Sequence, residues 1–256
     1  MDNPFAPDLL IEEDGPVRIV TMNRPEALNA FSPSLHAAVA KVWRHVADDP
    51  DARAVVFTGA GRAFSAGGDM ELFRVIAKDR EQRRRLLDEA RTVVLELIEC
   101  PLPVIGAVNG PAIGLGCSLA VLCDLIVMSE QAYLSDPHVS VGLTAGDGGA
   151  PTWPTAMSLP RAKEYLFTGD RITAETALQL GIVNRVTPAE TTLATALELA
   201  HRLAQQPPQA LQSTKRAVNM HLRRAVDGVL EYALAAEYHS FDTDEHHEAV
   251  SRFLSR

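Results

Sequence analysis

Gly59-Ala60-Gly61-Arg62-Ala63-Phe64-Ser65-Ala66-Gly67-Gly68-Asp69 is the stretch around which the rest of the sequence is organised. It follows an apolar run, Ala54 to Phe57, of the kind that forms a buried strand in a parallel sheet. Glycine and alanine let a ligand approach the backbone closely, so that free N–H groups can point at an oxygen atom. A plain surface turn between a strand and a helix explains the same residues. A second donor and a proton-transfer group elsewhere in the chain would decide between the two.

A second glycine-rich turn, Ala107 to Cys117, stands before another helical pattern. The first backbone N–H groups of a helix are unpaired and carry the positive end of its dipole. Two such turns that face one pocket could form an oxyanion hole. A dinucleotide or nucleotide site is the rival interpretation. Neither turn has the G-x-G-x-x-G spacing or a Walker lysine, and Ser65 does not lie in a G-x-S-x-G motif.

Composition limits the classes of function. The 256 residues allow one large domain or two modest ones, and 46% hydrophobic with 22% charged residues is typical of a globular protein. A net charge of −9 argues against nucleic acid or anionic membranes as partners. The start of the chain lacks the pattern of a signal peptide, so we expect a cytoplasmic protein. Residues 100–123 carry no charge, but their prolines and glycines predict a buried strand, a turn and a buried helix rather than a membrane span.

The hydrophobic pattern predicts an α/β protein that ends in a helical layer suited to oligomer contacts. Ser32 and Pro33 have the residue types of a helix start. We expect strands at 8–13, 16–22, 53–58, 103–108, 124–128, 132–134 and 183–186, helices from 33, 78–99, from about 114, 161–167, 173–178, 189–205, 208–224 and 227–251, and a functional loop at 135–154.

No metal site is expected from the cysteines or from the paired histidines. Cys100, Cys117 and Cys123 are an odd number without a C-x-x-C pair, and the last two lie in apolar surroundings typical of core residues. His246-His247 stands among acidic residues, which a solvated helix end explains better than a metal site.

In their order and spacing, several motifs resemble the crotonase, or enoyl-CoA hydratase/isomerase, superfamily. The resemblance covers nearly the whole chain. It rests on Asn23-Arg24-Pro25 with Leu28-Asn29-Ala30, Ala63 to Asp69, Asn109 to Cys117, Leu166 to Asp170, and Gly181 to Asn184. It implies a spiral of ββα units with the coenzyme A thioester site over residues 1–190, and a C-terminal helical trimerisation region over 191–256. It also implies a homotrimer or a hexamer made of two trimers.

The resemblance further implies acyl-CoA substrates and no permanently bound cofactor, with coenzyme A as part of the substrate. The thioester oxygen would accept hydrogen bonds from the N–H groups of the residues that match Ala66 and Leu115. Arg24, Arg62 and Lys215 are candidate contacts for the coenzyme phosphates. The further substrate or coenzyme contacts implied are Glu26, Ala27, Leu28, Ala63, Gly67, Gly68, Asp69, Met70 and Gly114.

The chain departs from the hydratase pattern where the acid–base chemistry should be. Ser118 and His138 stand where hydratases of this family have their two glutamates. The loop from Asp136 to Gly148 is instead similar to the camphor-dione (β-diketone) hydrolase branch, in which a histidine, an aspartate and a distal glutamate activate water. His138, Asp147 and Glu237 match those catalytic positions. Imidazole suits proton transfer near neutral pH, although His138 could simply pack beneath the loop while Asp147 caps the next helix.

These observations leave three readings open. Because Ala66 to Asp69 keeps the thioester-binding form, the leading one is an acyl-CoA enzyme with a His–Asp base. It would hydrate its substrate, or hydrolyse a C–C bond, in fatty-acid or ring-degradation metabolism. The alternatives are a CoA-independent β-diketone hydrolase working by retro-Claisen cleavage, and a non-catalytic CoA-binding or scaffold member.

Overall fold

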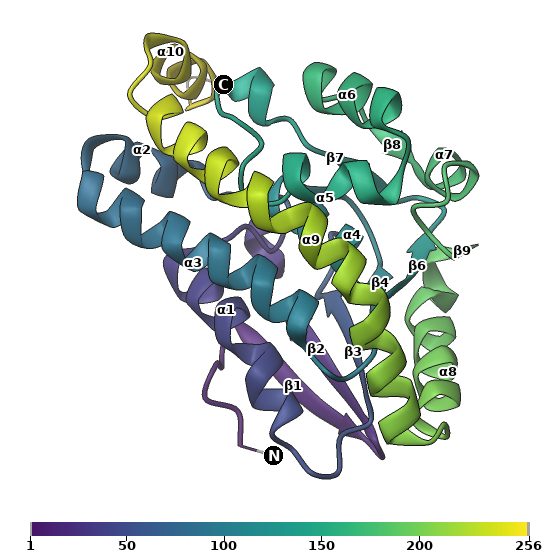
Figure 1. Cartoon of the computed structure of the whole chain (residues 1–256). Helices are drawn as coiled ribbons and strands as arrows, with labels where there is room; N and C mark the ends of the chain where they lie inside the picture. Colours follow the sequence, from purple (N-terminus) through teal and green to yellow (C-terminus); the bar gives the residue numbers. More distant parts are fainter. Residues whose placement is uncertain (1, 255–256) are drawn as a thin grey trace.

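A computed structural model describes residues 2–254 and shows a mixed α/β fold built on two sheets (Figure 1). In the larger sheet β1 (Leu9–Asp14) pairs antiparallel with β2 (Val17–Met22), and all further neighbours are parallel. Its order is β1-β2-β3-β4-β6-β9. The remaining strands are β3 (Ala54–Gly59), β4 (Val104–Val108), β6 (Leu125–Ser129) and β9 (Arg185–Thr187), with β5 (Ala112–Ile113), β7 (Tyr133–Ser135) and β8 (Ile172–Thr173) in a smaller sheet.

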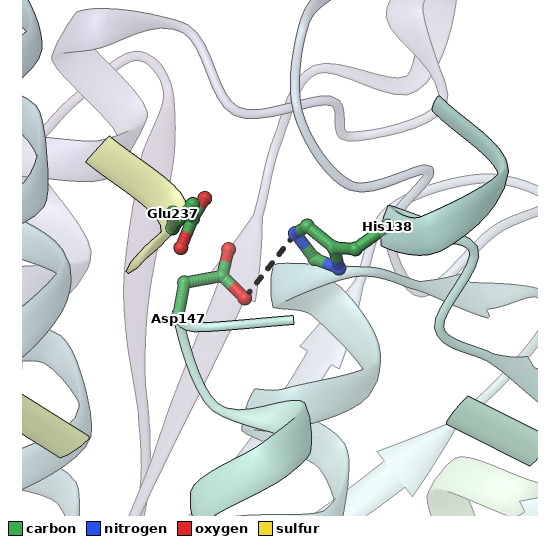
Figure 2. A group of neighbouring side chains, drawn as sticks. All are labelled: His138, Asp147 and Glu237. Carbon is green, nitrogen blue, oxygen red and sulfur yellow. Dashed lines mark ion pairs between the residues drawn. The ribbon is translucent and has the colours of Figure 1, made fainter. Parts of the chain in front are cut away.

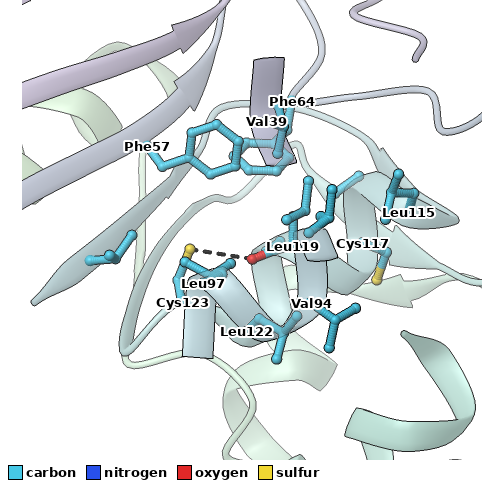
Figure 3. Packing of buried hydrophobic residues seen from close by; sticks show 14 of the residues in the cluster. Val39, Phe57, Phe64, Val94, Leu97, Leu115, Cys117, Leu119, Leu122 and Cys123 are labelled. Atoms are coloured by element: carbon cyan, nitrogen blue, oxygen red, sulfur yellow. Dashed lines mark hydrogen bonds between the residues drawn. The ribbon is translucent and has the colours of Figure 1, made fainter. Parts of the chain in front are cut away.

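Helices cover both faces of the larger sheet. Helix α8 packs on one face, where Ala196, Leu199 and Ala200 meet apolar side chains of β2, β3, β4 and β6. The opposite face carries the main core (Figure 3). The helices are α1 (Pro33–Ala47), α2 (Met70–Lys78), α3 (Arg80–Glu99), α4 (Leu115–Leu122), α5 (Gly149–Ala156), α6 (Leu159–Thr168), α7 (Ala174–Gln179), α8 (Thr192–Ala204), α9 (Pro208–Ser240) and α10 (Asp244–Leu254), with 3-10 turns η1 (Pro25–Ala27), η2 (His138–Val141) and η3 (Ala189–Thr191).

Most predicted elements are confirmed, and their ends follow from local chemistry. The first six predicted strands lie within one residue of their predicted bounds. Ser32 caps α1 by accepting a hydrogen bond from the N–H of Leu35 at 3.2 Å. The predicted helix at 78–99 begins at Arg80, because Asp79 caps it by accepting from the N–H groups of Glu81 and Gln82. No helix within residues 2–254 combines the length and apolar character needed to cross a membrane.

The C-terminal helices differ from the prediction. Helix α9 is one helix of 33 residues, so the expected boundary between 224 and 227 is wrong. The expected helix 227–251 is interrupted instead between Ser240, where α9 ends, and Asp244, where α10 begins. Gly228 is exposed, and a Cβ atom added there would meet no heavy atom within 4 Å. The buried residues Val226 and Leu230 continue the helical spacing across it. Helix α9 also packs against α3 and α5 (Figure 1), and its buried leucines join the main core. The described part of the C-terminal region, residues 191–254, therefore contributes to the core as well as to a helical layer.

His246 is a second correction, because it is buried rather than solvated. Its ring centroid lies 4.9 Å from that of Phe241 and 6.4 Å from that of Phe73. Nδ1–H donates to the carbonyl oxygen of Val141 at 2.8 Å, and burial lowers the pKa of the imidazole. Asp244, Glu245 and Glu248 of α10 are exposed, whereas Asp242 precedes the helix and pairs with Arg83; α10 packs against α2.

The three cysteines are buried, as predicted for Cys117 and Cys123. The Cys123 thiol donates to the carbonyl oxygen of Leu119 at 3.3 Å (Figure 3). Burial raises the pKa of each thiol, so all three remain protonated and behave as small apolar residues.

Lys215 ties α9 to the sheet. Its ammonium donates to Asp124 Oδ2 at 2.6 Å and to the Leu102 carbonyl oxygen at 2.7 Å, with only 8% of its side chain exposed. Replacing Lys215 by alanine leaves a largely buried carboxylate without its cation, so we expect the free energy of unfolding to fall by about 3 kcal/mol. Urea unfolding measures this. Arg84→Ala, which breaks the exposed pair with Asp88, should cost no more than about 0.5 kcal/mol. An equal loss of unfolding free energy in both variants would contradict a stabilising buried ion pair between Lys215 and Asp124.

Candidate active site

A cavity of about 560 Å³ opens between the two glycine-rich turns, α1, α2, α3, η2 and α9. Its wall is mostly apolar, and a few polar groups converge on it. The lining residues are Ala27, Ala30, Phe31, His36, Ala66, Gly67, Gly68, Asp69, Leu72, Phe73, Leu86, Leu87, Ala90, Ile113, Gly114, Leu115, Pro137, His138, Val141, Asp147, Glu237 and Phe241. A cavity of this size with few polar groups is typical of a small-molecule site.

The two glycine-rich turns lie side by side at this cavity. The Ile113 N–H donates to the Ser65 carbonyl oxygen at 2.9 Å. A Cβ atom on Gly116 would lie 2.5 Å from that of Ser65, and one on Gly67 would lie 2.7 Å from the Ile113 carbonyl oxygen. Only glycine permits so close an approach. The predicted meeting of the two turns at one pocket is therefore confirmed.

The backbone donors differ from the prediction at the first turn. The Ala66 N–H donates to the Leu28 carbonyl oxygen at 2.9 Å, so it is already used and cannot be a free donor. The Gly68 N–H makes no hydrogen bond to any described residue, and Gly68 lines the cavity. The same holds for the N–H of Leu115, the first residue of α4. The structure therefore does not leave the Ala66 N–H available, whereas the N–H two residues later has no partner among the described residues; hydrogen bonding across the turn cannot be seen in the sequence.

His138 lies at the start of η2, where Figure 2 shows its ring facing Asp147, and Asp136 lies against the other ring nitrogen. Its Nδ1–H donates to Asp136 Oδ1, and Asp136 is fully buried. Its Nε2 faces Asp147 Oδ1 across 3.5 Å. We did not predict a role for Asp136. The D-x-H spacing is the signal that could have suggested one, because a carboxylate that accepts from Nδ1 fixes the tautomer of the ring.

Glu237 reaches the same point from α9 (Figure 2). One side-chain nitrogen or oxygen atom from each of His138, Asp147 and Glu237 lies within 4.8 Å of the other two. Gly146 makes room for the glutamate, since a Cβ atom there would lie 2.6 Å from its Oε2. Asp147 does not cap α5, whose N-cap is Gly148 without a side-chain cap. The structure therefore brings together all three residues predicted for proton transfer.

The pKa values of His138 and Glu237 are both raised, the first by neighbouring charges and the second mainly by burial. Burial alone would lower the pKa of His138, but the negative charges of Asp136 and Asp147 outweigh it and hold the pKa well above its usual value. Burial raises the pKa of Glu237 well above its usual value, and the charge of Asp147 adds to this. Both shifts favour the protonated forms of His138 and Glu237. A metal ion bound by His138, Asp147 and Glu237 would have to displace the protons on His138 and Glu237.

Comparison with known proteins gives the family. A family model described as enoyl-CoA hydratase/isomerase matches residues 12–256. The chain belongs to the enoyl-CoA hydratase/isomerase family. It is 32% identical to the short-chain-enoyl-CoA hydratase of Clostridium acetobutylicum, over 97% of this chain and 95% of that protein. It is 33% identical to the 2,3-dehydroadipyl-CoA hydratase of Escherichia coli, over 97% and 96%. A crystal structure of an enoyl-CoA hydratase/isomerase from Mycobacterium paratuberculosis superposes with a TM-score of 0.95, at 46% identity, covering 98% of this chain and 100% of that one.

This chain is therefore an enzyme of the enoyl-CoA hydratase/isomerase family that acts on acyl-CoA. Ser118, which stands where family hydratases carry a glutamate, does not reach the cavity. Its hydroxyl donates to the Gly114 carbonyl oxygen at 3.3 Å. Gly148 packs against it so closely that a Cβ atom there would lie 2.4 Å from that of Ser118. The loop thus fills the space that a longer side chain at 118 would need.

The substrate contacts expected from the family fall into two groups. Ala27, Gly67, Gly68, Asp69 and Gly114 line the cavity, whereas Glu26, Leu28 and Ala63 do not. Glu26 is exposed beside the turn, and the side chain of Met70 lies outside the described part of the chain. Lys215 is held by Asp124 and is not available for coenzyme phosphates.

The raised pKa of Glu237 links this family member's stability to pH. Above the ordinary pKa of glutamate, near 4.5, the unfolded chain releases this proton while the folded protein keeps it. Glu237 therefore makes the free energy of unfolding fall as pH rises towards its folded pKa. Glu237→Gln removes this dependence, so its melting temperature should match the parent protein near pH 5 and exceed it by a few degrees near pH 8.5. Scanning calorimetry at both pH values checks this, and a variant less stable at the higher pH would contradict the buried, protonated glutamate.

Proposed function

We propose that this enzyme adds water to the carbon β to the thioester of an acyl-CoA, with His138 as the base. The N–H groups of Gly68 and Leu115, both free and both at the cavity, are the proposed oxyanion hole. They would stabilise the negative charge that develops on the thioester oxygen as an enolate forms. The observation that carries the proposal is the cluster of His138, Asp147 and Glu237 at the same cavity.

Each member of the cluster has a defined role in the proposed proton transfer. Asp136 accepts from Nδ1–H and so presents Nε2 to the cavity as the base. His138 Nε2 takes a proton from water while the hydroxide adds to the β carbon of a 2-enoyl-CoA. Protonated Glu237 then gives its proton to the α carbon, and the proton on His138 returns to Glu237. Asp147, 3.5 Å from Nε2, stabilises the imidazolium formed in between.

Hydrolysis of a C–C bond is the second candidate, favoured by the absence of a carboxylate at Ser118. Water activated by His138 would add to the oxo carbon of a β-oxoacyl-CoA. The bond between the α and β carbons then breaks, and its electrons pass to the thioester as an enolate. Glu237 protonates the α carbon, which yields a carboxylic acid and a shorter acyl-CoA. The same residues serve both reactions, so the substrate decides between them.

Products formed in H₂¹⁸O distinguish these candidates. The protein is offered matched 2-enoyl-CoA and β-oxoacyl-CoA compounds, and mass spectrometry follows the label. Hydration places ¹⁸O in a 3-hydroxyacyl-CoA, whereas C–C hydrolysis places it in a released acid. Absence of binding to any CoA thioester at millimolar concentration, with turnover of a free β-diketone, would favour the CoA-independent hydrolase. Binding without turnover of any compound would favour a non-catalytic member.

The pH dependence of turnover follows from the raised pKa of His138. The imidazole acts as a base only when neutral, and the raised pKa of His138 makes higher pH necessary to form that species. We therefore expect kcat/KM to rise with pH from 6 to beyond 8. Asp147→Asn removes one of the charges that raise this pKa, so the rising limb should shift to lower pH while the maximal rate falls. A profile that is flat from pH 6 to 9 in both proteins would contradict the assignment of His138 as base.

We further propose that the enzyme is a homotrimer or a hexamer that assembles through the C-terminal helices. Helix α9 exposes four large apolar side chains, of which Tyr232 is 76% exposed and Val218 61%. Such side chains gain stability when a partner covers them. The predicted division into a core (1–190) and an oligomerisation region (191–256) rests on this proposal. Analytical ultracentrifugation measures the assembly directly.

A further inference from the structure

His36 is a buried polar residue at the cavity that the proposed chemistry does not use. It lies on α1, is 3% exposed, and lines the cavity together with Leu86, Leu87 and Ala90 of α3. Within the wall that α1 and α3 contribute, His36 is the polar side chain and the other three are apolar. His138, by contrast, reaches the cavity from η2, so the two histidines belong to different walls.

Glu89 of α3 fixes the tautomer of this ring, that is, which ring nitrogen carries the proton. Its Oε2 lies 3.0 Å from His36 Nδ1, and 41% of the Glu89 side chain is exposed. Because a carboxylate only accepts hydrogen bonds, Nδ1 must carry the proton. In the neutral ring Nε2 is then left as an acceptor. Nε2 makes no hydrogen bond to any residue in the described part of the chain, so its lone pair has no protein donor.

Packing keeps the imidazole in this orientation. The ring of Phe31 meets that of His36 edge to face, with centroids 6.1 Å apart and planes at 81°. Helices α1 and α3 pack along each other, which keeps His36 next to Glu89. An acceptor held rigidly in an apolar wall favours a ligand that brings a donor to that point and disfavours one that leaves it unpaired.

We propose that His36 is a specificity-determining residue that accepts a hydrogen bond from a hydroxyl group on the acyl chain, away from the thioester. This inference rests on the proposed function, since it assigns one wall of the same cavity to the acyl group. The class of substrate is then an acyl-CoA with a hydroxyl group on its chain or ring. Glu89 is a positioning residue, because it acts only by holding the proton on Nδ1.

Binding of unreactive, saturated thioesters tests this without relying on turnover. Butanoyl-, hexanoyl- and octanoyl-CoA are each paired with the compound that carries a hydroxyl group on its last carbon, and isothermal titration gives both dissociation constants. In the parent protein we expect the hydroxylated member of at least one pair to bind roughly tenfold more tightly. His36→Phe keeps a planar ring but removes the acceptor. The dissociation constant of the plain thioester divided by that of its hydroxylated partner should then fall to one or below.

Two further variants separate recognition from packing. Leu87→Ala enlarges the same wall without touching the acceptor, so it should weaken both members of a pair and leave their ratio unchanged. Glu89→Gln can either accept from Nδ1 or donate to it, so it no longer fixes the tautomer and should reduce the ratio several-fold. Equal ratios in the parent protein and in His36→Phe would overturn the proposed role of His36 and leave the acyl-CoA site unaffected. If no thioester binds the parent protein, the acyl-CoA site itself is refuted, and the inference falls with it.

Discussion

Replacement of His138 by alanine is expected to lower kcat/KM by roughly 10³-fold, since a positioned general base typically contributes 10²- to 10⁴-fold. His138 is the group whose Nε2 faces the cavity while Asp136 holds its Nδ1. In the proposed reaction Asp147, 3.5 Å from Nε2, stabilises the imidazolium and is not the base. Initial rates with whichever thioester the labelled-water experiment identifies measure the loss.

The controls for this variant test orientation and folding separately. Asp136→Asn keeps the shape of the side chain but can leave Nδ1 without an acceptor, so it should lower kcat by more than tenfold with little change in KM. His201→Ala removes a partly exposed histidine whose Nε2 bonds Asp14 at 2.9 Å, and activity should not change. A His138→Ala protein that folds and retains activity within a few-fold would show that the base is another group.

Replacement of Leu115 by proline should lower kcat by about 10²- to 10³-fold, the usual effect of losing one oxyanion donor. Leu115 is the first residue of α4, a position that proline tolerates because its N–H has no partner within the helix. The substitution therefore removes the proposed donor with little change to the helix. Leu115→Ala is the matched control, since it also shortens the buried side chain but keeps the N–H.

Comparison of these two variants isolates the backbone donor. Both should lose some stability through packing, and circular dichroism with thermal melting measures that part. We expect only the proline variant to lose kcat far beyond this, with KM changed little, because the interaction strengthens as the oxygen gains charge. Equal activity of the two variants would contradict the N–H of Leu115 as a donor. The N–H of Gly68 would then remain as the proposed donor.

The residues whose proximity could be predicted from the sequence were those that belong to recognisable motifs. His138 and Asp147 lie nine residues apart on one loop, so their proximity could be expected locally. Glu237 is 90 residues further on, and only the match to a known family connected it to them. The structure brings all three together at the cavity. Asp136 was overlooked because its role depends on the direction in which the His138 ring turns, which no spacing specifies.

The sequence by itself determined most of the longer strands and helices, the two glycine-rich turns and the family, because these follow from local periodicity and contiguous motifs. Tertiary structure decided which backbone donors are free. Ala66 is paired across the turn with Leu28, while Gly68 is not. It also decided that α9 runs unbroken past Gly228 to deliver Glu237, and that His36 lies in the wall of the cavity. Hydrogen-bond pairing and burial are settled by residues distant in the chain, so they become visible only when the fold brings those residues together.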